Sequence, residues 1–186
     1  ILRTWSLPSG DYFSYTNYGK AWFSWEWLAD VLLALIHKYA GLNGIAFWAN
    51  ATFALTFTLL FSWTAKRGGN VLIGLLLSRV AGFAAAVHWL ARPHLFSMLL
   101  VLFWYMLLER IQRQGSAGDG RLGKTAWVLP PLMVLWTNLH GAFVIGVVLL
   151  VIYALGNFLS AVVRQEQAGK VQAMRLARHF FWIAML

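Results

Sequence analysis

The chain has 186 residues, of which 60% are hydrophobic and only 11% are charged, whereas soluble domains carry about 25% charged residues. This balance indicates an integral membrane protein, and eleven tryptophans suit a chain with two lipid–water interfaces. The net charge of +9 does not indicate nucleic-acid binding, because the basic residues form short clusters between apolar runs. Cysteine is absent, which excludes a disulfide framework and a thiolate metal site.

The first element predicted is an extracytoplasmic segment, residues 1–41, that ends in an amphipathic helix at about 24–40. At 100° per residue its apolar and polar side chains fall on opposite sides, as in a helix lying at a membrane surface. The apolar side holds Leu28, Val31, Leu32, Leu35 and Tyr39, and the polar side holds Glu26, Asp30 and His37. Ser24 is the expected N-cap, and Gly41 the expected end of the helix.

Residues 42–186 are predicted to form a transmembrane domain, since a crossing needs about 20 apolar residues. We expect five crossings and the start of a sixth, at about 42–65, 71–89, 94–109, 126–138, 142–163 and 179–186. Pro130 and Pro131 should distort the short fourth crossing, because proline removes a helix hydrogen bond. The predicted fold class is therefore all-α, a polytopic transmembrane helical bundle with an extracytoplasmic amphipathic surface helix. Because the last crossing is cut short and no signal peptide opens the chain, we expect part of a longer protein.

Lysine and arginine orient these crossings. Ten of the fifteen basic residues lie in three alternate connections, which the positive-inside rule assigns to the cytoplasm. They are Lys66, Arg67, Arg110, Arg113, Arg121, Lys124, Arg164, Lys170, Arg175 and Arg178. The N-terminal segment and the turns at 90–93 and 138–141 should then face outward. The glycine-rich loop 115–124 lacks the spacing of a phosphate-binding loop, and we expect a flexible cytoplasmic connector.

The outer face should collect three of the chain's six acids and four of its five histidines. The residues concerned are Asp11, Glu26, Asp30, His37, His88, Arg92, His94, Asn138 and His140. Carboxylates with histidines can bind a divalent metal or act as a general base, and arginine can hold a phosphate with two hydrogen bonds. This combination suits transfer from a lipid-phosphate donor. Glu26 and Asp30 are the candidate catalytic residues. Candidates for substrate binding are Arg92, His94, His88, Asn138 and His140.

A structural role is open for each of these residues. Glu26, Asp30 and His37 fit the solvated side of a surface helix, and Arg92 with Pro93 fits a snorkelling arginine before a helix's first turn. Asn138 and His140 can cap a tight turn that Gly141 permits.

Arg79 lies midway along 71–89 and is a further candidate for substrate binding. An arginine within a membrane usually faces a cavity or a partner, here a lipid phosphate or an internal carboxylate. The metal, if one binds, is not identified by the sequence.

Three motifs in order resemble a known group: "GDYFSYTNYGKAWFSWEWLADVLLALIHKYAGLNG", "ARPHLFS" and "LWTNLHGAF". They resemble bacterial polytopic proteins of the GT-C glycosyltransferase superfamily, which includes oligosaccharyltransferases, protein O-mannosyltransferases and aminoarabinose transferases. The resemblance covers most of residues 1–163. It implies a polyprenyl-phosphate-sugar donor and an outward-facing site in the bacterial inner (cytoplasmic) membrane, in some members with a divalent metal.

The same resemblance implies roles for individual residues. Glu26 would be the acidic position of the first outer loop, Arg92 and His94 would match the "RPH" element, and Asn138 and His140 the "NLHG" element. The superfamily's D-x-W-W-H-L-R-T-G motif is a departure, because this sequence opens at "ILRTWSLPSG", just after its expected place. Either the sequence is part of a longer protein, or the chain has lost catalysis.

Two other functions fit the same residues. One is a non-catalytic accessory subunit of a larger membrane complex, energy-transducing or pigment-binding, in which His88, His94 or His140 ligates a pigment or haem. The other is a transporter, suggested by Arg79 and the proline pair. The expected partners are membrane lipids, a polyprenyl-phosphate sugar donor and, for a subunit, other proteins; nucleic acid is not expected.

Overall fold

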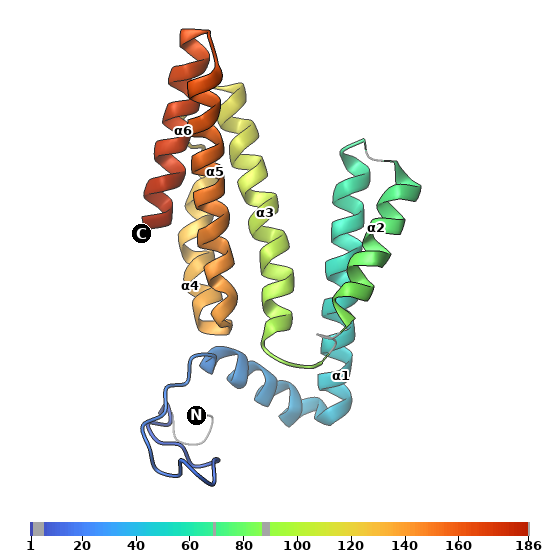
Figure 1. Cartoon of the computed structure of the whole chain (residues 1–186). Coiled ribbons are helices and arrows are strands. Elements are labelled where there is room, and N and C mark those ends of the chain that lie inside the picture. The colour runs from blue at the N-terminus through green and yellow to red at the C-terminus, as the bar shows by residue number, and fades with distance from the viewer. Residues whose placement is uncertain (2–5, 69, 87–89, 186) are drawn as a thin grey trace. The chain divides into compact units, whose positions relative to one another are not determined.

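The computed structural model describes residues 1, 6–68, 70–86 and 90–185, which form helices joined by loops (Figure 1). In the N-terminal loop, Gly10 and Ala21 form an isolated antiparallel bridge. The all-α fold class is confirmed. The helices are α1 (Trp27–Lys66), α2 (Val71–Ala84), α3 (His94–Ala117), η2 (Lys124–Val128), α4 (Leu129–Leu139), η3 (Gly141–Phe143), α5 (Val144–Val163) and α6 (Gln167–Met185).

Three helical segments of the described residues are long and apolar enough to cross a membrane. They are Trp27–Lys66, His94–Ala117 and Gly141–Val163. The apolar helix α2 has 14 residues, which cover about 21 Å at 1.5 Å per residue, less than the roughly 30 Å of a bilayer core. These findings support the prediction of a membrane protein.

Several helix ends differ from the predicted ones. Helix α1 begins after Glu26 as its N-cap, so the prediction of Ser24 as N-cap is wrong. Helix α3 continues beyond residue 109, and α6 begins well before residue 179. In both cases the helix continues through basic residues at which the predicted crossing begins or ends. Lysine and arginine mark the predicted membrane boundary, but they do not end a helix because they are good helix formers.

The proline pair lies where the type of helix changes. Pro130 and Pro131 are the second and third residues of α4, directly after Leu129. The predicted fourth crossing, 126–138, begins in the 3-10 helix η2 and becomes α-helical only at Leu129. Proline lacks a backbone N–H and is tolerated in the first turn of an α-helix, which agrees with a change of helix type at this place. The short segment is therefore irregular at the prolines, in line with the predicted distortion.

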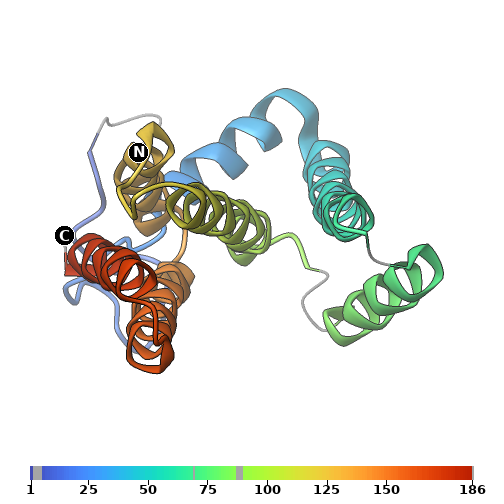
Figure 2. The same cartoon turned by 90° about the horizontal axis from the view of Figure 1, so that it is seen from above.

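The chain divides into two compact units. The first unit comprises Ile1–Ser97 with Thr137–Gly141. Within it α1 bends at Gly41, whose φ of 61° is not helical, which confirms the predicted break. Figures 1 and 2 show residues 27–40 running across the direction of residues 42–66. The second part of α1 packs against α2, which Asn70 begins by accepting hydrogen bonds from the N–H groups of Leu72 and Ile73.

The second unit comprises Met98–Trp136 with Ala142–Leu186. Its helices α5 and α6 lie side by side (Figure 1), and the indole N–H of Trp104 in α3 donates to the carbonyl of Gly146 in α5 at 3.0 Å. Gln112 of α3 and Asn157 of α5 exchange two amide hydrogen bonds, at 2.9 and 2.8 Å. Polar bonds therefore tie α3 to α5 within an apolar core.

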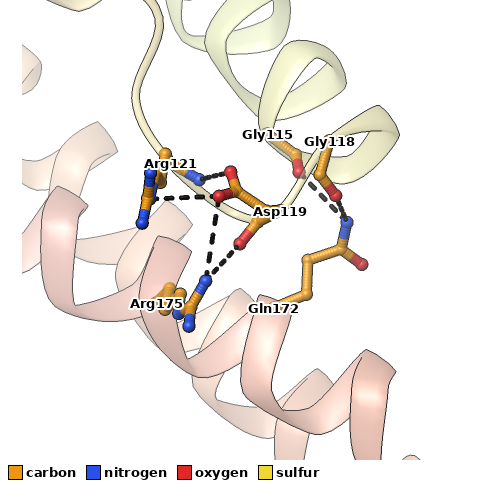
Figure 3. A network of polar contacts seen from close by, with 6 residues as sticks. All are labelled: Gly115, Gly118, Asp119, Arg121, Gln172 and Arg175. Atoms are coloured by element: carbon orange, nitrogen blue, oxygen red, sulfur yellow. Dashed lines mark hydrogen bonds and ion pairs between the residues drawn. The ribbon is translucent and has the colours of Figure 1, made fainter.

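The loop after α3 is hydrogen-bonded to α6 (Figure 3). The side-chain amide of Gln172 donates to the carbonyl oxygens of Gly115, Ser116 and Gly118, at 3.1, 2.9 and 2.6 Å. These bonds satisfy carbonyl groups that a helix C-terminus leaves without intrahelical partners. The segment 115–124, predicted as a flexible connector, is thus attached to α6 at its beginning.

Candidate functional site

A chain of three polar side chains lies in the first unit. The Nε2 atom of His140 lies 3.4 Å from Oε1 of Glu26, and its Nδ1 atom lies 2.9 Å from the hydroxyl of Ser97. Glu26 directly precedes α1, Ser97 lies in the first turn of α3, and His140 lies between α4 and η3. Three segments far apart in the sequence thus meet at one imidazole ring.

A second contact joins the same segments. The indole N–H of Trp27 donates to the side-chain oxygen of Asn138 at 2.6 Å. Because Trp27 follows Glu26 and Asn138 lies two residues before His140, this bond lies beside the carboxylate–imidazole contact. The ring of His94 approaches that of His140, with 6.4 Å between the ring centroids. His94 and Ser97 are three residues apart on α3 and share one face of the helix.

The protonation of His140 depends on opposing influences. Burial lowers its pKa below the ordinary value of 6.5, the negative charge of Glu26 raises it, and the neighbouring His94 lowers it further. The net effect is a lowered pKa, so the imidazole is neutral at pH 7. An ionised Glu26 favours the tautomer with the proton on Nε2, in which Ser97 donates to Nδ1.

Two of the three side chains are partly exposed to solvent. The side chain of Glu26 is 35% exposed and that of His140 is 23% exposed, while Ser97 is buried. A carboxylate beside a neutral imidazole can remove a proton from a hydroxyl group placed against it. Because both side chains are partly exposed, such a hydroxyl can reach them, whereas the buried Ser97 contacts only the ring nitrogen Nδ1.

Several predicted site residues do not take part in these contacts. Four are exposed and make no side-chain hydrogen bond or ion pair with a described residue: Asp30, His37, Arg79 and Arg92. Asp30 lies one turn after Glu26 on α1, and Arg92 lies just before α3. His88 lies outside the described residues.

Asp11 has a structural role instead. Its buried carboxylate accepts hydrogen bonds from the hydroxyl of Ser14 and from the backbone N–H groups of Phe13 and Ser14. These bonds, with that of the Ser14 hydroxyl largest, lower the pKa of Asp11 below its ordinary value. The residue therefore closes the N-terminal loop.

Sequence reasoning missed Ser97 and Trp27. A serine hydroxyl and an indole carry no charge and cost little to bury, whereas the predicted residues are charged or strongly polar side chains between apolar runs. The signal for Ser97 was its place as the last residue of "ARPHLFS", one helical turn after His94. Trp27 lies within "WEWL" beside Glu26. Tryptophan is common at membrane interfaces, so its presence there did not indicate a contact with the site.

The described residues contain no group of three or more His, Cys, Asp or Glu side chains that could hold a metal ion. Comparisons with protein families, curated proteins and solved structures found no match to the chain.

Proposed function

We propose that the protein is an integral membrane glycosyltransferase of the GT-C type, which transfers a sugar from a polyprenyl-phosphate donor at the extracytoplasmic face. The observation that carries the proposal is the contact between Glu26, His140 and Ser97. Each of these residues comes from a different one of the three motifs that resemble the superfamily. Motifs that form one transferase site should meet in space, and this contact supports that expectation.

The proposed reaction uses the half-exposed carboxylate as general base. Glu26 removes the proton of an acceptor hydroxyl, whose oxygen attacks the anomeric carbon of the donor sugar while the bond to the phosphate oxygen breaks. His140 orients the carboxylate through Nε2–H, and Ser97 holds the ring by its hydrogen bond to Nδ1. Arg92, just before α3, and His94, its first residue, hold the departing phosphate, whose negative charge the guanidinium of Arg92 neutralises.

The proposal includes a topology. Five crossings are formed by the second part of α1, by α2, by α3, by α4 with η2, and by α5, and α6 enters a sixth. Glu26, Arg92 and His140 then lie outside the bacterial inner membrane, and the ten clustered basic residues lie on the cytoplasmic side. Residues 27–40 lie on the outer surface, where the bend at Gly41 directs them.

The test is sugar transfer by the full chain reconstituted in vesicles with a radiolabelled polyprenyl-phosphate sugar. Glu26→Gln and Arg92→Ala should each lower transfer about 100-fold or more, the effect expected for removal of a general base or a positioned charge. Thermal unfolding should be unchanged, because both side chains are partly or fully exposed.

Two matched variants serve as controls. Glu166→Gln and Arg110→Ala change exposed residues of the second unit and should leave transfer intact. Full activity of Glu26→Gln and Arg92→Ala would refute the proposal. A wild-type chain that transfers no sugar would favour the accessory-subunit alternative, and visible absorbance would then indicate its pigment-binding form.

A further inference from the structure

A cavity of about 730 Å³ is lined by residues of the second unit, none of which takes part in the proposed glycosyl transfer. It lies between the segment 121–130 and α6. Its lining includes Arg121, Trp127, Arg175, Arg178, His179 and Trp182. Cationic and aromatic side chains thus share one cavity.

The cavity carries a positive charge. Asp119 holds two of its arginines: its carboxylate lies 3.0 Å from Nε of Arg121 and 3.9 Å from Nη1 of Arg175, as Figure 3 shows. Arg175 also donates to the backbone carbonyl of Asp119 at 3.1 Å. Arg178 is exposed and forms no ion pair with a described residue. The cavity thus has three guanidinium groups, of which the carboxylate of Asp119 contacts two.

The lining also follows one face of α6. Arg175, Arg178, His179, Trp182 and Ile183 are spaced i, i+3, i+4, i+7 and i+8, the spacing of a single helix face. Ala173, Leu176, Ala177 and Phe180 are buried and form the opposite face, which packs in the core. The cavity side of α6 is therefore separate from the side that holds the fold together.

Polarity changes along this face. The arginines come first, and Trp182 and Ile183 follow about 10 Å further along the helix at 1.5 Å per residue. Across the cavity, Trp127 is 80% exposed, and Trp182 is 62% exposed. Large exposed indole rings beside arginines are typical of the boundary between lipid head groups and acyl chains.

We propose that this cavity binds an anionic phospholipid. The guanidinium groups of Arg121, Arg175 and Arg178 hold the phosphate, since arginine pairs with phosphate oxygens through two hydrogen bonds. The first part of the acyl chain lies along Trp182 and Ile183. Basic pockets on the cytoplasmic side of membrane helices commonly hold such head groups, and the cavity's arginines belong to the residues that the positive-inside rule predicts to be cytoplasmic.

The apolar end of the cavity favours a lipid over a free phosphate ion. A phosphate ion would be satisfied by the arginines alone and would gain nothing from two exposed indole rings. A phospholipid uses both ends, and the anionic lipids of a cytoplasmic leaflet supply the negative charge that the arginines require.

The test is native mass spectrometry of the full chain in detergent, titrated with phosphatidylglycerol or phosphatidylcholine of identical acyl chains. One phosphatidylglycerol should bind in preference to phosphatidylcholine. Arg178→Gln should weaken its binding about fivefold, the contribution expected of one basic residue near a lipid surface. Arg110→Gln, an exposed arginine of α3 outside the cavity, should leave binding unchanged.

Two further measurements separate lipid from phosphate. Inorganic phosphate should fail to displace phosphatidylglycerol, and Trp182→Ala should weaken the binding of phosphatidylglycerol. Displacement by inorganic phosphate at equal concentration would refute the lipid assignment. Equal binding of the two lipids, or an equal loss in Arg110→Gln, would overturn the site itself, whatever the outcome of the glycosyl-transfer assay.

Discussion

The two units of the chain use polar side chains in different ways. In the second unit, Asn157 is buried and bonded to Gln112 of another helix, and Glu109 accepts a hydrogen bond from Tyr153 at 2.6 Å. In the first unit, the contact between Glu26 and His140 is longer and partly exposed. Polar residues of similar kind thus serve two purposes in this chain. In the second unit they join neighbouring helices, and in the first unit they stay partly accessible to solvent.

The packing of the second unit has a physical reason. Between helices in a membrane, lipid tails are as apolar as leucine, so close contact and hydrogen bonds replace the hydrophobic effect as the source of association. Small residues permit such contact: Gly146, Ala154 and Ala161 are buried on one side of α5. The hydrogen bonds between the helices of this unit therefore contribute to its stability.

The largest expected effect on stability concerns Gly146. A carbon added there would lie 2.9 Å from the Trp136 ring and 3.0 Å from the end of Met133. Gly146→Leu should lower the free energy of unfolding by about 1–3 kcal/mol, the usual cost of overpacking. Gly156→Leu is the control, because nothing lies within 4 Å of that position on the same helix. Thermal unfolding in detergent measures both, and equal stability of the two variants would contradict the close packing.

A smaller effect is expected at Asn157. Asn157→Leu leaves the part-buried side-chain amide of Gln112 without its partner on α5. It should cost about 0.6–1.7 kcal/mol, the range for polar contacts between membrane helices. Asn50→Leu should have little effect, because Asn50 is exposed and donates only to Ala46 of its own helix. The double replacement of Gln112 and Asn157 by leucine should recover much of the loss. Destabilisation of Asn50→Leu by as much as Asn157→Leu would break the comparison.

The smallest expected effect is the pH dependence contributed by His140. Its folded pKa is lowered, so the unfolded chain takes up the proton first as the pH falls. Stability should be constant above about pH 6.5, the ordinary histidine pKa, and decline below it until the folded pKa is passed. His140→Gln should remove this part of the decline. Parallel losses of melting temperature in the wild type and the variant would show that other groups cause it.

The sequence predicted the helical class and the break at Gly41, because apolar length and a glycine after an amphipathic segment are local signals. Helix ends were less predictable. The basic residues that mark a membrane boundary do not stop a helix, so α3 and α6 extend past the predicted limits. The irregularity of the fourth crossing at Pro130 and Pro131 was predictable, because proline lacks a backbone N–H, and η2 changes to α4 there.

The candidate site was predicted in part. Glu26, His94, Asn138 and His140 were selected as charged or polar residues between apolar runs, and the structure brings them together. Asp30 and Arg92 were selected by the same reasoning but are exposed. Ser97 could not be predicted in this way, because burying a serine hydroxyl costs little free energy. Its role follows only from its contact with a ring nitrogen of His140.

The bend at Gly41 has a consequence for the whole of α1. Its φ of 61° and ψ of −159° lie in a region of backbone space that essentially only glycine occupies. With any side chain there, the 40 residues of α1 would favour one straight rod of about 60 Å, twice the thickness of a bilayer core. Glu26 would then be carried to the far tip of that rod. The place of the carboxylate beside His140 thus depends on a single hydrogen atom where every other amino acid has a carbon.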